Sequence, residues 1–104
     1  MTKDDLLALL SQHIGAENGL PAQCFAVMLG IHERQIRKFV TELRENGVAV
    51  CGTPQDGYFI AATAEELEAT CQFLRSRSMH TLRLEACMRK LPMPDLIGQL
   101  KLNT

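Results

Sequence analysis

A glycine separates two apolar helical patterns in residues 26–43, AVMLGIHERQIRKFVTEL. Two helices that cross at a steep angle need a small residue where they approach most closely. The tight turn between them also needs a backbone that tolerates a positive φ. Ala26 meets the first need and Gly30 meets the second, so the stretch predicts two helices joined by a tight turn.

Three helices are expected in the first half of the chain. Thr2 and Asp5 are spaced as a helix cap, and leucines then recur at three- and four-residue steps until a glycine at position 15. Pro21 suits the start of a second helix, and Gly47 suits the end of a third. The third helix would bury Ile36, Phe39, Val40 and Leu43 on one face. The predicted helices span residues 2–14, 21–29 and 32–46.

The apolar period changes from helical to alternating after residue 47, which indicates strands. VAVC at residues 48–51 and YFIA at residues 58–61 are the expected strands. GTPQDG between them is rich in turn-forming residues, so the two strands predict a β-hairpin. Three helices and a hairpin make the predicted fold α+β, a mainly helical winged helix-turn-helix domain over residues 1–62.

The spacing of small and apolar residues over positions 22–39 resembles the helix-turn-helix of DNA-binding proteins. The runs LGIHERQIRKFVTELRENGVAV and GYFIAATAEELEATCQFLRSR resemble a group of small phage and prophage winged-helix proteins, whose helix-turn-helix is of the biotin-repressor-like kind. This resemblance covers residues 5–91 and is most specific at GYFIA and TAEEL. It implies DNA binding, and we expect a phage or prophage transcriptional regulator that binds double-stranded DNA sequence-specifically.

The expected helix 32–46 carries basic side chains opposite its apolar face. Successive helical residues are rotated by about 100°, which places Arg34, Arg37, Lys38 and Thr41 on the outward side. Arginine can fork to guanine edges and lysine can hold phosphate, so we expect this helix to enter the major groove. The candidate DNA-binding residues are His32, Glu33, Arg34, Gln35, Arg37, Lys38 and Thr41.

A solvated surface helix is the alternative interpretation of the same residues. Glu33 with Arg37, and Lys38 with Glu42, have the spacing of intrahelical ion pairs. The expected turn at residues 52–57 contains an aspartate and no basic residue, so it would contact DNA through backbone amides or only close the hairpin. His32 also stands where serine or threonine would be expected to cap the helix.

A long helix is predicted after the hairpin. Thr63 and Glu66 have the spacing of a capping box, and no helix breaker follows before Pro92. The helix 64–91 would be roughly 40 Å long, more than a domain of this size can cover. We expect it to form a homodimer through Leu82, Leu84, Cys87, Met88 and Leu91. Alternatively, the tail of residues 92–104, with a turn or two at 95–102, covers this apolar surface.

Composition and motifs exclude several other functions. No apolar run approaches the ~20 residues of a membrane span, and acidic residues stand where a signal peptide has basic ones, so we expect a cytoplasmic protein. The four cysteines form no C-x-x-C pair, and no phosphate-binding glycine loop is present, so we expect no metal, cofactor or enzyme activity. The formal net charge of −1 argues against indiscriminate coating of nucleic acid. It somewhat favours the rival function, a non-catalytic adaptor that keeps the winged-helix fold and binds a phage or host protein.

Overall fold

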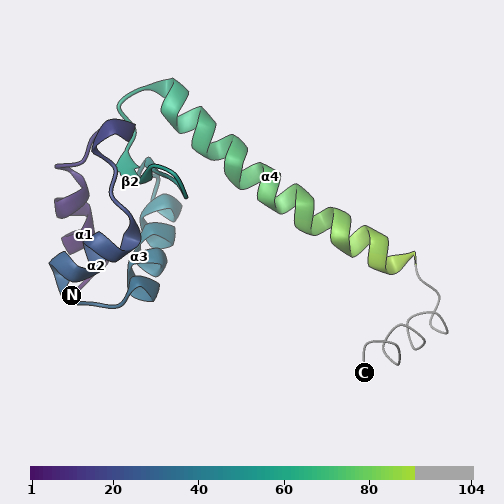
Figure 1. Cartoon of the computed structure of the whole chain (residues 1–104), viewed down its shortest axis with the longest axis horizontal. Coiled ribbons are helices and arrows are strands. Elements are labelled where there is room, and N and C mark those ends of the chain that lie inside the picture. The colour runs from purple at the N-terminus through teal and green to yellow at the C-terminus, as the bar shows by residue number, and fades with distance from the viewer. Residues whose placement is uncertain (91–104) are drawn as a thin grey trace. The chain divides into compact units, whose positions relative to one another are not determined.

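A computed structural model describes residues 1–90 of the chain and confirms the predicted α+β class (Figure 1). Residues 1–72 form one compact unit, and α4 continues from Phe73 into a second. The domain boundary expected at residue 62 stays a prediction. The elements in chain order are α1 (Lys3–Leu10), the 3-10 helix η1 (Ala16–Asn18), α2 (Ala22–Leu29), α3 (Glu33–Glu45), β1 (Val50–Thr53), β2 (Gly57–Ile60) and α4 (Ala64–Arg89).

The cap of α1 forms as predicted, but the helix ends earlier than expected. The Thr2 hydroxyl accepts the N–H of Asp4, and the Asp5 carboxylate accepts the N–H of Thr2 at 2.8 Å. The helix stops at Leu10 because the chain beyond it pairs with β2. The N–H of Ile60 donates to the carbonyl of His13 at 2.9 Å, and the N–H of Gly15 donates to Ile60 at 2.8 Å. The expectation of a helix up to residue 14 was therefore wrong.

The predicted hairpin is confirmed, with strands shifted along the chain. β1 and β2 pair antiparallel, with Val50 opposite Ile60 and Thr53 opposite Gly57. β1 begins two residues later than expected because the N–H of Val48 still donates to the carbonyl of Leu43 at the end of α3. At the end of α3 the chain reverses at Gly47, which has a φ of 84°, and the bond from Val48 is part of this helix cap. Residues 48 and 49 therefore connect α3 to β1 and are not part of the strand.

A segment before α2 pairs with the hairpin, which the sequence did not predict. Leu20 and Tyr58 exchange both backbone hydrogen bonds, at 3.1 and 2.7 Å. The approach is close enough that a Cβ on Gly57 would collide with the backbone of Leu20. Residues 13–20 thus join the free edge of β2, and the unpaired groups of that edge find partners.

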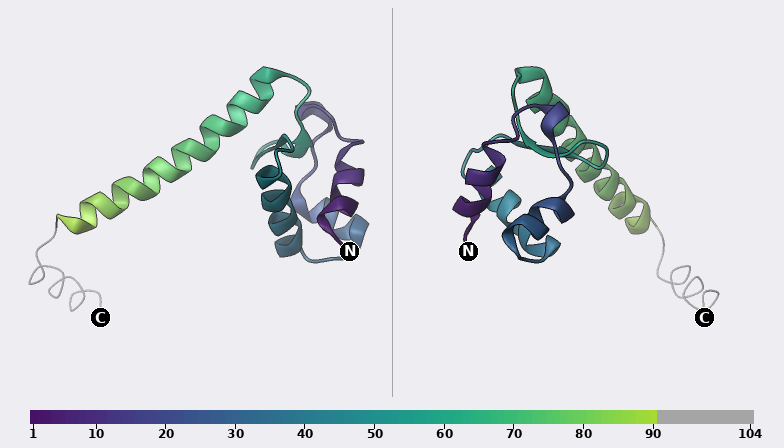
Figure 2. Two further views of the ribbon diagram at one scale, coloured as in Figure 1. Left: turned by 180° about the vertical axis from the view of Figure 1, so that it is seen from behind. Right: turned by 60° about the vertical axis from the view of Figure 1, so that its left-hand side comes forward.

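The core lies among α1, α2, α3 and the start of β1. The three helices pack together in both views of Figure 2, with the hairpin at one end of the group. Helical spacing brings an apolar side chain from each helix to this centre every three or four residues. The buried residues of the core cluster are Leu6, Leu10, Phe25, Ala26, Ile36, Val40, Leu43 and Val50.

The first turns of α4 are fixed to the hairpin and to η1. The Thr63 hydroxyl accepts the N–H of Glu66 at 3.2 Å, as predicted. The Glu66 carboxylate accepts the N–H groups of Ala62 and Ala16, each at 2.8 Å. Thr70 is buried, and its hydroxyl accepts the N–H of Gly52 at 3.4 Å.

The predicted extent of α4 agrees with the structure as far as Arg89. Leu91 of the expected dimer set, the expected turn at residues 95–102 and the whole tail lie outside the described residues. Within residues 1–90, no helix combines the length and the apolar character that crossing a membrane requires.

Candidate nucleic-acid interface

The turn between α2 and α3 has the conformation that the sequence predicted. Gly30 lies in the left-handed region with φ 69° and ψ 35°, and its N–H donates to carbonyls at the end of α2. A Cβ at Gly30 would meet nothing within 4 Å, so the glycine serves the backbone conformation rather than close packing. Ala26 is buried where the helices pack, which meets the predicted need for a small residue. The turn sets the direction in which α3 leaves.

α3 divides into a buried face and an exposed face. Ile36, Val40 and Leu43 are buried in the core, and Phe39 is half-buried at the border. The predicted outward residues are all exposed: Arg34, Arg37, Lys38 and Thr41. These four residues are called the basic face of α3 below. Because the opposite side of the helix is anchored in the core, the basic face is held toward solvent.

Two of these side chains have partners on the helix itself. The Arg37 guanidinium pairs with the Glu33 carboxylate at 3.0 Å, one turn earlier. The Thr41 hydroxyl donates to the carbonyl of Arg37 at 3.1 Å and keeps its capacity to accept. Within residues 1–90, Arg34 and Lys38 form no ion pair, and the Lys38–Glu42 pair considered from the sequence is not formed. Arg34 and Lys38 therefore present charges that an anionic partner could take.

The first turn of α3 carries the other candidate residues. His32 is the N-cap residue, but its side chain makes no capping hydrogen bond. Its carbonyl accepts the N–H of Gln35 at 3.0 Å and that of Ile36 at 3.3 Å. A shallow hollow at this turn is lined by His32, Glu33, Arg34 and Gln35. The structure thus brings all seven candidate DNA-binding residues together on one short helix.

The hairpin tip is a closed turn with an acidic residue. The Thr53 hydroxyl accepts the N–H of Asp56 at 3.0 Å and lies 3.4 Å from its carboxylate. No lysine or arginine lies between Thr53 and Gly57. The tip has backbone groups and a negative charge to offer, whereas α3 carries the positive charges.

Arg44 is a residue of α3 for which the sequence predicted no role. Its Nε donates to the carbonyl of Val50 at 2.8 Å, and the side chain is half-buried between α3 and β1. One signal was present, because Arg44 follows Thr41 by three residues and so lies at the edge of the basic face. Its engagement with β1 makes it a structural arginine that fixes the hairpin to α3.

Other chemistry has little support in the described part of the chain. Over residues 1–90, no three histidine, cysteine or acidic side chains gather as a metal site. His13 is engaged with the backbone of Asn18 at 2.8 Å and with the ring of Phe25. In comparisons with known proteins, no family model, no curated protein and no solved structure matches the chain.

Proposed function

We propose that the protein binds double-stranded DNA sequence-specifically with α3 in the major groove. In this proposal residues 1–62 are a winged helix-turn-helix in which the hairpin is the wing. The observation that carries it is the basic face of α3, held outward by a buried opposite face and preceded by the Gly30 turn. A solvated helix would account for exposed charges, but it would not require the turn that sets the helix direction.

The contacts of each side chain suggest different roles on DNA. Arg34 and Lys38 are exposed and without an ion pair in the described residues, so Arg34 suits guanine and Lys38 suits phosphate. The Glu33 carboxylate pairs with the Arg37 guanidinium and orders this side chain before DNA binds. An ordered arginine loses less side-chain entropy when it binds a base edge.

The small number of basic side chains limits how this binding can work. The basic face of α3 holds Arg34, Arg37 and Lys38, so few phosphates can be neutralised, non-specific affinity should be low and base contacts must contribute the discrimination. This balance suits a regulator that must find particular sites. From the resemblance noted in the sequence, we further propose a role in phage or prophage transcription, in the cytoplasm and without a cofactor or catalysis.

The test is selection of bound duplexes from a random pool, followed by titration at two salt concentrations. Arg34→Ala should weaken binding to the selected site by about 1–3 kcal/mol and relax the preference at one position. Lys38→Ala should weaken all sequences alike and lower the salt slope by about one. Lys3→Ala removes a positive charge from α1 and is the control that should leave binding unchanged. If the Arg34→Ala/Arg37→Ala double variant binds like the wild type, α3 is not the DNA-reading helix.

A second candidate function is protein binding by the same fold. α2 has no charged residue, and it exposes Val27 at 77% and Met28 at 55%. An apolar exposed helix next to the Gly30 turn is unusual for a helix that crosses a phosphate backbone. If duplex binding is absent at low salt, an adaptor that uses α2 becomes the better proposal.

A further inference from the structure

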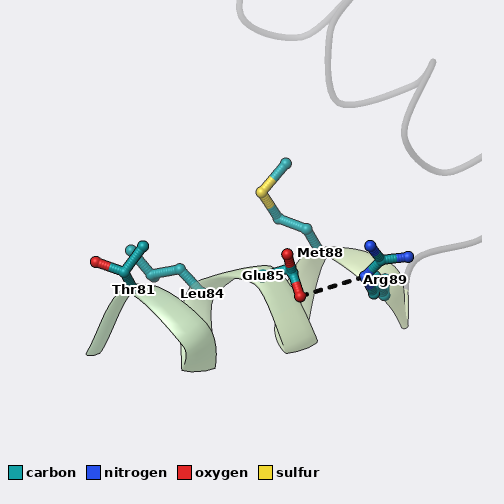
Figure 3. Close-up of a pocket in the computed structure, with 5 residues that line it drawn as sticks. All are labelled: Thr81, Leu84, Glu85, Met88 and Arg89. Carbon is teal, nitrogen blue, oxygen red and sulfur yellow. Dashed lines mark ion pairs between the residues drawn. The ribbon is translucent and has the colours of Figure 1, made fainter. Parts of the chain in front are cut away.

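One face of α4 carries residues at alternating four- and three-residue spacing beyond the buried Thr70. The residues are Leu74, Arg77, Thr81, Leu84 and Met88, here called the α4 seam. Leu74, Leu84 and Met88 are 40%, 52% and 65% exposed. Figure 3 shows Thr81, Leu84 and Met88 along the last turns, with the Glu85–Arg89 ion pair beside them. This spacing is the one that two helices need to pack along a common seam.

The seam is distinct from the rest of the α4 surface. Leu82 is 55% exposed, nearly the same as Leu84, yet two residues on a helix lie about 200° apart around its axis. Leu82 therefore points away from the seam, and Cys87 lies beside it. Of the described residues in the dimer set expected from the sequence, only Leu84 and Met88 lie on the α4 seam.

We propose that the α4 seam binds the α4 seam of a second copy, with the two helices antiparallel. The charges of α4 favour this occupant and this direction. In the first turns of α4, Glu65, Glu66 and Glu68 are acidic, and no residue from position 64 to position 74 is basic. The Glu66 carboxylate accepts backbone N–H groups of its own chain. The rest of the described helix and the residue after it carry Arg75, Arg77, Arg83, Arg89 and Lys90 against Glu85 alone. In an antiparallel pair with Leu74 level with the partner's Leu84, Glu68 lies level with the partner's Lys90. Parallel pairing instead sets the basic residues of the two helices level with one another.

The position of Arg77 is a second argument against parallel pairing. In a parallel, in-register pair, Arg77 would face the partner's Arg77 within the seam, and two like charges would be desolvated together. In an antiparallel pair with Leu74 level with the partner's Leu84, Arg77 lies level with the partner's Thr81. The Arg77 guanidinium already lies 5.9 Å from the centre of the Phe73 ring, to one side of the seam. Its stem can then cover apolar surface while the charge remains in water.

Matched leucine variants of the whole chain test the surface. The seam spans only a few helical turns, so association should be weak and should depend on concentration. Light scattering of the wild type should show a mass that rises to that of a dimer as concentration increases. Leu84→Glu should remain monomeric, while Leu82→Glu, at nearly equal exposure on the other side, should associate like the wild type. A wild type that is monomeric at every concentration overturns the proposal and leaves residues 91–104 as the candidate cover; equal effects of the two variants also overturn it.

Disulfide trapping tests the direction. The background carries Cys24→Ser, Cys71→Ser and Cys87→Ser and keeps the buried Cys51. Leu74→Cys chains mixed with Leu84→Cys chains should cross-link to each other faster than either links to itself, because antiparallel pairing sets these positions level. Faster linking of like chains would show parallel pairing and overturn the proposal. Neither experiment uses DNA, so their failure is separable from a failure of the proposed function.

Discussion

Glu66 joins three segments of the chain through one carboxylate. The carboxylate accepts the N–H of Ala16 in η1 and the N–H of Ala62 before α4. The backbone N–H of Glu66 donates to the hydroxyl of Thr63. The hydrogen bonds that the carboxylate accepts from the backbone, that of Ala16 first, lower the pKa of Glu66 below its ordinary value of 4.5. A carboxyl group whose pKa is lowered in the folded state stabilises that state when the pH is above the ordinary pKa. This contribution is lost as the pH falls through the lowered pKa.

Glu66→Gln should therefore destabilise the protein at neutral pH, and the difference from the wild type should shrink as the pH falls below 4.5. Urea unfolding followed across this pH range measures the effect. Glu65→Gln removes the same charge one residue earlier and is the matched control, because Glu65 accepts none of the backbone hydrogen bonds that Glu66 does. If the two glutamine variants differ from the wild type by the same amount at every pH, the hydrogen bonds of Glu66 do not contribute as described.

Among the elements, the helices could be predicted more accurately than the sheet. Helices are predicted by local sequence signals. The Thr2 cap predicted the start of α1, the apolar spacing predicted the buried face of α3, and the glycines at 30 and 47 predicted where α2 and α3 end. The pairing of residues 13–20 with β2 could not be predicted, because its partners lie some forty residues apart and no local pattern marks them. The basic face of α3 followed from helical periodicity, whereas the role of Arg44 depends on where β1 lies.

The hairpin packs against residues 19–21 so closely that there is no room for a side chain at Gly57. Gly57 and Gly30 have similar φ angles of 75° and 69°, but a Cβ on Gly57 would lie 2.7 Å from the nitrogen of Pro21, whereas one on Gly30 meets open space. Gly30→Ala should lower the free energy of unfolding by about 1 kcal/mol, because alanine is strained in the left-handed conformation. Gly57→Ala should cost a similar amount and roughly 1–3 kcal/mol more for the collision. Thermal unfolding of both variants measures this, and equal losses would show that the hairpin does not press against the segment before α2.

At the scale of the whole molecule, the proposed DNA contacts and the proposed self-association can reinforce each other. One α3 offers few basic side chains, and the α4 seam offers little area, so neither contact should be strong alone. Linking two DNA-binding units converts the second contact into an intramolecular one and raises the affinity for paired sites. The two proposals together therefore predict a protein whose affinity depends on how many half-sites the DNA carries.

The last prediction compares duplexes with one and with two copies of the selected half-site at the best spacing. The wild type should bind the two-copy duplex more tightly, on the order of 10²-fold, because two copies bind it together. Leu84→Glu should lose this advantage and bind the one-copy duplex as the wild type does, since the α4 seam contributes no base contact. Arg34→Ala should weaken binding to both duplexes, and Leu82→Glu should change neither. If Leu84→Glu keeps the full preference for two copies, the α4 seam does not join the DNA-bound copies, and the preference arises from contacts elsewhere on the chain.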